Sequence, residues 1–328
     1  MIKKSKAKSL NIGFQIFLIP EIGVLLPILI LVIITTIINP NFLTRRYLSS
    51  ILIGSVSIGA AALGEAFVIM SGEIDLSVGY IGCLAGIICG KAAMAWGWGP
   101  VPAILLGLFV GILVGFINGF ISSKIGLSSW ITTISTQFIC QGVATTIAQG
   151  YQQSVSSFGL QSFTRVRPLG LTWIFFIFII LIIIMDCVLR KTPFGYKLRA
   201  LGGNRNAAEM AGIDVKNVKI IAFILAGLFA AMGGLFDTLQ NGGASDAFGA
   251  GREFRAITCC AIGGISMTGC SGSIFGVGLG VLLFHTIWYC LRILNLSPNA
   301  QMVLIGFILI LAVIFDLQRK RIEDHRLI

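Results

Sequence analysis

Carboxylate and amide side chains interrupt long apolar stretches at a few positions in this sequence. Glu65 lies within a run of small and apolar residues, and Asp75 lies in a break between two such runs. A carboxylate at the centre of a membrane helix costs about 2.5–3.5 kcal/mol on insertion scales, so it faces a bundle interior or a pore. We therefore interpret a set of polar residues as candidates for a solute pathway: Glu65, Asp75, Asn118, Gln137, Gln141, Asp237 and Gln240.

Each candidate also has a structural interpretation, and the residues alone leave both open. Glu65 could accept hydrogen bonds from solute hydroxyl groups, pair with Arg252 or Arg255, or be held protonated. Asp75 precedes a predicted helix and could cap its exposed amide groups. Each remaining candidate could instead make a helix–helix hydrogen bond, which is worth about 0.6 kcal/mol.

Composition indicates that lipid surrounds most of the chain. Of its 328 residues, 56% are hydrophobic and 11% are charged, whereas a soluble domain is about 25% charged. The formal net charge of +11 could suggest nucleic acid, but the basic residues cluster beside apolar stretches. That placement is typical of membrane topology. The sequence therefore predicts a membrane protein without a nucleic-acid partner.

Ten apolar segments approach the length of about 20 residues that a spanning helix needs. They predict an all-α polytopic membrane protein. With the N-terminus inside, the inner segments carry 16 of the 24 Lys and Arg residues, and this bias places both termini in the cytoplasm. The predicted spans are 21–38, 50–70, 77–95, 101–121, 127–148, 171–189, 218–238, 252–268, 273–291 and 300–317.

One transmembrane domain with two short tails follows from these spans. Residues 1–20 form a cytoplasmic tail with an interfacial helix at 10–20, residues 21–317 form the transmembrane domain, and residues 318–328 form a second cytoplasmic tail. The first apolar stretch is long, and no small-residue cleavage site follows it. We therefore interpret it as a retained span rather than a signal peptide.

The chain offers little for metal or nucleotide chemistry. Its eight cysteines lie in apolar segments without a C-x-x-C pair, and it has only two histidines, so the sequence predicts no metal site. It also lacks a G-x-x-x-x-G-K-[ST] loop and cannot hold ATP by that route. We expect no cofactor in this chain and no catalytic residue.

Glycine recurs every four residues in three predicted spans, which lets helix backbones approach closely in lipid. Two other stretches, 70–79 and 263–272, break the helical pattern at membrane depth. Irregular backbone is tolerated there only where it is buried in protein or lines water. The paired breaks indicate an internal repeat with a pathway between its halves. The glycine stripes are Gly82, Gly86, Gly90; Gly107, Gly111, Gly115, Gly119; and Gly272, Gly276, Gly280.

The largest polar connection between spans covers residues 190–219. Pro193 and Gly195 end the sixth span, Gly202-Gly203-Asn204 predicts a turn, and residues 206–212 predict a short helix that Gly212 stops. A short helix in a basic cytoplasmic loop could be a plain connection, a lipid-surface anchor or a surface that docks into a partner. The third interpretation assigns the docking surface to Gly202, Gly203, Asn204, Ala207, Ala208, Gly212 and Ile213.

Three segments of the chain resemble one family. They are Ile74-Asp75-Leu76-Ser77-Val78-Gly79, the LGGN, AA and GI-x-V-x-x-VK pattern within 201–219, and AIGGISMTGCSG at 261–272. The resemblance is to bacterial sugar ABC permeases of the ribose, xylose, arabinose and galactoside type, within the branched-chain amino acid and monosaccharide permease superfamily. It extends from about residue 42 to residue 316.

The resemblance implies a non-catalytic permease subunit of the inner membrane that moves a monosaccharide or a related sugar-like solute by alternating access. It implies a fold similar to that of the vitamin B12 importer permease, with 190–219 as the ATPase-coupling loop. It also implies partners: a cytoplasmic ATP-binding cassette ATPase, a second permease copy or close paralogue, and a periplasmic or lipid-anchored sugar-binding protein.

The chain departs from the family pattern at several places, which leaves the substrate open. Glu73 stands where the family usually has glycine, Glu65 where relatives commonly carry a neutral residue, and Arg255 replaces an acidic or neutral one. The stretch before the sixth span is also short.

Two other classes of function are compatible with parts of the sequence. An ion-coupled secondary transporter would use Glu65, Asp75 and Asp237 as ion sites, and a membrane enzyme acting on lipid would need a cluster of nucleophiles that the sequence does not show. A permease for a nucleoside or a furanosyl signalling molecule is a further alternative within the same family.

Overall fold

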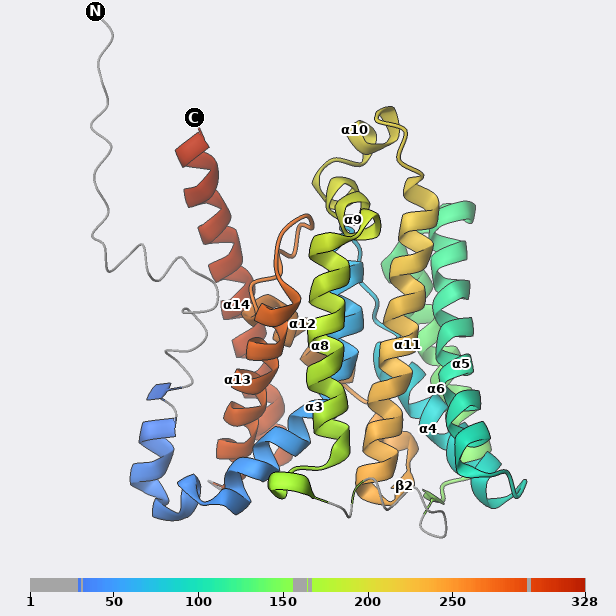
Figure 1. Ribbon diagram of the computed structural model, residues 1–328, viewed down its shortest axis with the longest axis vertical. Helices are drawn as coiled ribbons and strands as arrows, with labels where there is room; N and C mark the ends of the chain where they lie inside the picture. Colours follow the sequence, from blue (N-terminus) through green and yellow to red (C-terminus); the bar gives the residue numbers. More distant parts are fainter. Residues whose placement is uncertain (1–28, 31, 156–163, 165–166, 294–295, 328) are drawn as a thin grey trace, which may run out of the picture.

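The computed structural model is a bundle of helices that run between two ends of the molecule (Figure 1). It describes residues 29–30, 32–155, 164, 167–293 and 296–327. The long helices are α3 (Arg45–Met70), α4 (Val78–Met94), α5 (Pro100–Phe120), α6 (Ser129–Ala148), α8 (Trp173–Lys191), α11 (Val215–Asn241), α13 (Ile274–Ile293) and α14 (Pro298–Leu327). Shorter helices are α9 (Pro193–Gly203), α10 (Arg205–Met210) and α12 (Arg252–Ile262).

The remaining elements are short and lie between helices. Single helical turns form η1 (Pro40–Leu43), η2 (Ile121–Ile125), η4 (Pro168–Gly170) and η5 (Asp246–Phe248). Strands β1 (Gln153–Ser154) and β2 (Gly243–Ala244) pair antiparallel, with Gln153 opposite Ala244. The β2 strand lies at the end of the bundle opposite α9 and α10 (Figure 1).

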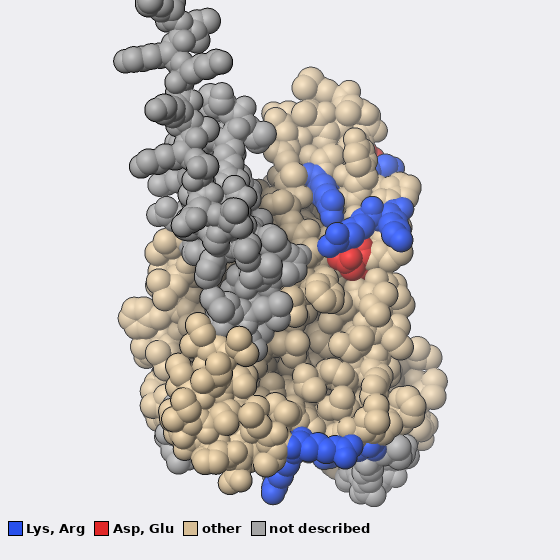
Figure 2. Space-filling view, turned by 60° about the vertical axis from the view of Figure 1, so that its left-hand side comes forward, with Lys and Arg blue, Asp and Glu red and all other residues tan. Residues whose placement is uncertain are grey.

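Five described helices are long and apolar enough to cross a membrane: α3, α5 extended through η2, α8, α11 and α13. The helix α4 and residues 299–314 of α14 are apolar but shorter. On the face shown in Figure 2, Lys and Arg gather towards the upper and lower ends, with an uncharged band between them. Length, composition and charge placement together show an all-α integral membrane protein.

The helix α11 lies at the centre of the bundle and packs against α3, α4 and α5. A Cβ atom on Gly111 of α5 would lie 2.4 Å from the carbonyl oxygen of Gly227, and one on Gly227 would lie 2.1 Å from that of Gly111. Both distances are shorter than real Cβ contacts, so only glycine allows these two backbones to meet. The close packing predicted from the glycine stripe of α5 is confirmed.

The predicted span at 252–268 is wrong in extent. The helix α12 ends at Ile262 after 11 residues, a rise of about 16 Å, whereas the hydrocarbon core is about 30 Å thick. A Cβ atom on Gly263 would lie 2.6 Å from the Gly276 carbonyl oxygen, so the chain leaves the helix where its backbone meets α13. The interfacial helix at 10–20 lies outside the described residues, and of the span 21–38 residues 29–30 and 32–38 are described as helical.

Candidate functional site

The two predicted breaks in the helical pattern lie against each other. The first follows the end of α3 at Met70, and the second follows α12. The Cys270 amide donates a hydrogen bond to the Met70 carbonyl oxygen at 3.0 Å, although 200 residues separate them. Backbone from both halves of the chain is therefore joined at one point.

The helix α9 covers this junction through Gly202. A Cβ atom at Gly202 would lie 1.9 Å from the Met70 carbonyl oxygen and 2.6 Å from the Cys270 amide nitrogen. Gly202 and Gly203 are the last residues of α9, so the prediction that they form a turn is wrong. The lack of a side chain at Gly202 instead lets the backbone of α9 approach the backbone at Met70 and Cys270.

The short helix α10 follows directly and agrees closely with its prediction. The Asn204 side chain accepts a hydrogen bond from the Ala207 amide at 3.0 Å, which caps the helix start. Gly212 has φ +78°, a left-handed conformation that ends a helix. Ala208 is buried, whereas Ala207, Gly212 and the Met210 side chain are exposed, and Ile213 is half-buried. This end of the bundle thus presents α10 on its outer surface (Figure 1).

A buried ion pair lies beside the junction, and sequence reasoning did not find it. Lys219 of α11 contacts Glu73 with Nζ and Oε1 2.5 Å apart, and the two side chains are 7% and 23% exposed. The Ser129 hydroxyl donates to the other Glu73 oxygen at 2.5 Å. The pair therefore ties the first break to α6 and α11. Glu73 was visible as a departure from the family pattern, but nothing in the sequence identified Lys219 as its partner.

Asp75 and Asn118 belong to a buried hydrogen-bond network. The Asp75 Oδ1 atom accepts from the Ser77 amide at 2.8 Å and from the Ser77 hydroxyl at 2.5 Å. Asn118 Nδ2 donates to that hydroxyl oxygen at 2.9 Å, and Thr136 donates to Asn118 Oδ1 at 2.7 Å. The network links the break before α4 to α5 and α6. Its serine and threonine members were missing from the sequence prediction.

Glu65 is fully buried and points towards the same break. Its Oε1 atom accepts a hydrogen bond from the Asp75 amide at 3.1 Å, and its Oε2 atom has no hydrogen-bond partner among the described residues. Arg252 pairs with Asp237, while Arg255 lies over the Trp288 ring, 4.9 Å from its centre. The alternative in which Glu65 pairs with one of these arginines is therefore wrong, since both are held elsewhere.

The remaining candidates lie apart from this cluster. Gln240 Nε2 donates to the Ile53 carbonyl oxygen at 3.2 Å and so joins α11 to α3. The Gln137 amide lies against the Glu253 carboxylate, and Gln141 is half-buried on α6. The structure thus separates the candidates into a buried group around Asp75 and a second group, with Asp237 and Gln240, nearer the opposite end. Over the described part of the chain, no three His, Cys, Asp or Glu side chains are placed to hold a metal ion.

A bundle of long apolar helices defines a polytopic membrane protein. Residues 47–313 match the family model described as "Branched-chain amino acid transport system / permease component". The match covers most of the chain, and the chain belongs to this permease family.

Three relatives illustrate the similarity, two of them over nearly their full length. The chain is 34% identical to the ribose import permease protein RbsC of Bacillus subtilis (strain 168) over 302 residues, which cover 92% of this chain and 94% of that protein. It is 32% identical to the L-arabinose transport system permease protein AraH of Escherichia coli (strain K12), with 92% of each chain covered. It is also 32% identical to the galactose/methyl galactoside import permease protein MglC of Salmonella typhimurium over 58% of this chain and 59% of that one.

No solved structure matches the chain. The family and the names of the relatives confirm two expectations from the sequence. The resemblance to sugar ABC permeases holds, and the chain is a non-catalytic transport component rather than an enzyme.

Proposed function

We propose that this chain is the permease subunit of an ATP-binding cassette importer that moves a monosaccharide or a related sugar-like solute across the inner membrane. Relatives named for ribose, L-arabinose and galactose support the solute class. The observation that carries the mechanism is the contact of Gly202 with both breaks. A force applied to the outer surface at α10 would reach both breaks through Gly202, beside the contacts that α9 and α10 make with α11.

The coupling surface consists of Gly202, Gly203, Asn204, Ala207, Ala208, Gly212 and Ile213. A cytoplasmic ATPase that docks on α10 would displace α9 as its nucleotide-binding domains close. Since Met70 and Cys270 are hydrogen-bonded beneath α9, the displacement would move both breaks and change which end of the bundle is open. The exposure of α10 and the Asn204 hydrogen bond that caps its start favour a docking surface over a plain connection.

The proposed assembly contains two permease chains, the ATPase and a periplasmic or lipid-anchored sugar-binding protein. In it, both termini and the tails 1–20 and 318–328 face the cytoplasm, and residues 21–317 form the transmembrane domain, with a fold like that of the vitamin B12 importer permease. Asp75, Asn118 and Glu65 would act near the breaks. Gln137, Gln141, Asp237 and Gln240 would act nearer the opposite opening.

The test is ATP-dependent uptake of D-ribose, L-arabinose and D-galactose by proteoliposomes that contain the assembled importer. Gly212→Pro is the informative variant, because proline holds φ near −65° whereas Gly212 has φ +78°. Gly97→Pro is a matched control, since Gly97 has φ +66°. A Cβ atom added to either glycine would meet no described atom within 4 Å.

We expect Gly212→Pro to abolish uptake, while the chain still inserts into the membrane and elutes as a single species after purification in detergent. Gly97→Pro, which lies outside the coupling surface, should keep most of the uptake activity. Equal uptake by the two variants would contradict the coupling role of this loop. Absence of uptake of all three sugars by the unaltered importer would contradict the proposed solute class.

A further inference from the structure

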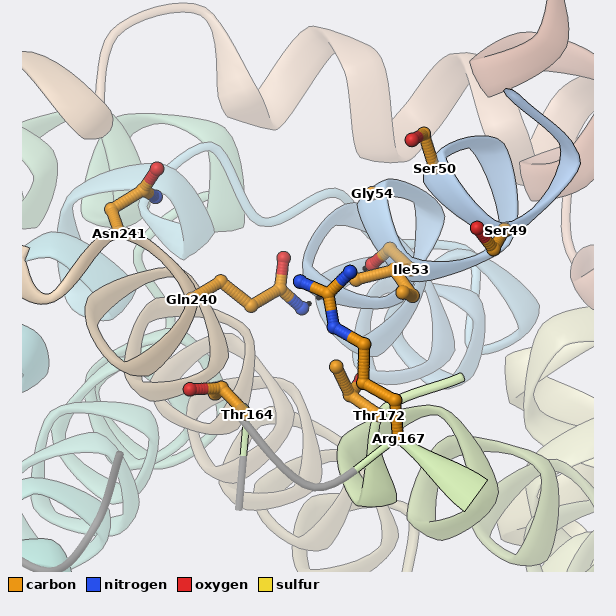
Figure 3. Close-up of a pocket in the computed structure, with 9 residues that line it drawn as sticks. All are labelled: Ser49, Ser50, Ile53, Gly54, Thr164, Arg167, Thr172, Gln240 and Asn241. Carbon is orange, nitrogen blue, oxygen red and sulfur yellow. Dashed lines mark hydrogen bonds between the residues drawn. The ribbon is translucent and has the colours of Figure 1, made fainter. Parts of the chain in front are cut away.

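A polar cavity of about 580 Å³ lies at the end of the bundle opposite α10. It is bounded by the start of α3, the end of α11 and the segment that leads into α8, and Figure 3 shows the side chains around it. Ligand sites in proteins have volumes of roughly 300–1,000 Å³ and are usually lined by apolar groups. Here seven of the nine described lining residues are polar, so the cavity suits a polar ligand.

The lining offers both donors and acceptors. Arg167 extends into the cavity next to Gln240 (Figure 3), and its guanidinium group carries five N–H donors. The Ser49 and Ser50 hydroxyls donate to the Arg46 carbonyl oxygen at 3.1 Å and 2.8 Å, which leaves their oxygen lone pairs to accept. No carboxylate is among the described residues that line the cavity. The lining therefore matches a ligand whose groups both donate and accept, as hydroxyl groups do.

We propose that this cavity binds a neutral polyhydroxylated solute and is the first site on the permease that the imported solute occupies. This proposal rests on the proposed function for the direction of transport and the solute class. Of the described lining residues, Arg167 alone is ionised, so an amino sugar, which carries a positive charge, should bind less well than its neutral counterpart. None of these residues is aromatic, so no ring can stack on a sugar face; binding rests mainly on hydrogen bonds and is weak, as a transit site requires.

The first test uses the permease chain alone in nanodiscs. Asn241→Cys, at an exposed position that lines the cavity, and Ser49→Cys are labelled with a membrane-impermeant anionic maleimide in the presence of D-ribose, L-arabinose, D-galactose or D-galactosamine. Arg46→Cys is the control, because Arg46 lies in the first turn of α3, is exposed and does not line the cavity. The unaltered chain gives the background from its native cysteines.

We expect at least one neutral sugar to slow labelling of Asn241→Cys and Ser49→Cys by at least about twofold, the protection that half occupancy gives, with Arg46→Cys unchanged. D-Galactosamine should protect less than D-galactose. If no sugar slows labelling at either position, the cavity is not a solute site. Equal protection by D-galactosamine and D-galactose would overturn the part assigned to Arg167.

The second test measures uptake by the assembled importer with Arg167→Gln and, as its control, Arg46→Gln. The binding protein sets the half-saturating concentration, so Arg167→Gln should lower the maximal rate and leave that concentration unchanged. An unchanged maximal rate would overturn the proposal. If a sugar is taken up but does not protect either cysteine from labelling, the cavity is not the site and the proposed function stands. If a sugar protects the cysteines but none is taken up, the cavity binds sugar and the proposed function is wrong.

Discussion

Glu73 and Lys219 form a buried ion pair, and we predict that replacing Glu73 lowers the stability of the protein more than replacing Lys219. Glu73→Gln leaves the Lys219 ammonium group, 7% exposed, without a counter-charge, and its remaining partners are the new amide oxygen and the Ser122 carbonyl oxygen at 3.3 Å. Loss of one partner from a buried pair costs about 3–5 kcal/mol. Because Glu73 is 23% exposed, water already screens part of the attraction, and we place the cost at about 3 kcal/mol.

Lys219→Met should cost less. It leaves the Glu73 carboxylate, which is the more exposed of the two groups and keeps the hydrogen bond from Ser129. The loss is then one charge-assisted hydrogen bond, about 1.5 kcal/mol. In the double variant Glu73→Gln/Lys219→Met no charge is stranded, so it should be more stable than Glu73→Gln alone.

The assay is thermal unfolding of the purified protein in detergent. At about 2–4 °C per kcal/mol, Glu73→Gln should lower the unfolding temperature by roughly 6–12 °C and Lys219→Met by roughly 3–6 °C. The control is Arg205→Gln, which breaks an exposed pair with Glu209 that is worth about 0.5 kcal/mol. The reasoning is refuted if the two single effects add in the double variant, or if Glu73→Gln is no more harmful than Arg205→Gln.

Three further predictions concern packing around the breaks. Gly202→Ala should lower both the unfolding temperature and the uptake rate, since its Cβ would meet backbone atoms from two segments. The control is Gly142→Ala, whose Cβ would meet no described atom within 4 Å. Equal effects of the two variants would count against the Gly202 contact. Gly227→Val should prevent α5 from packing on α11 and abolish stable expression, so a folded variant with normal uptake would disprove the packing argument. Glu65→Gln keeps an acceptor oxygen for the Asp75 amide while removing a fully buried carboxylate, so the unfolding temperature should not fall; unchanged uptake in the same variant would remove Glu65 from the solute pathway.

Most helices could be predicted from the sequence because their apolar runs have the length that lipid demands. The predicted and observed bounds of the third and fourth spans differ by one residue at each end. The end of α12 could not be predicted in this way. It depends on a backbone contact between Gly263 and Gly276, and a hydropathy pattern carries no information on contacts between helices.

The loop at 190–219 shows the same limit at Gly202. Glycine followed by glycine and asparagine is a common turn sequence, and this local pattern predicted a turn. The structure uses Gly202 for its lack of a side chain, against a partner more than 130 residues away in Met70. Asn204, by contrast, caps α10 through an amide three residues along the chain, and a contact this local lies within reach of a sequence pattern, which offers Asn204 and Asn206 as alternative caps.

The hydrogen bond from Cys270 to Met70 has a consequence for the order of events during transport. The two segments share this bond and are both in contact with one glycine, so neither can shift far while the other stays in place. If the proposed coupling holds, we therefore expect their displacements to be concerted, with no accumulation of a kinetic intermediate in which only one segment is displaced. Spectroscopic probes placed on the two segments should report a single relaxation time.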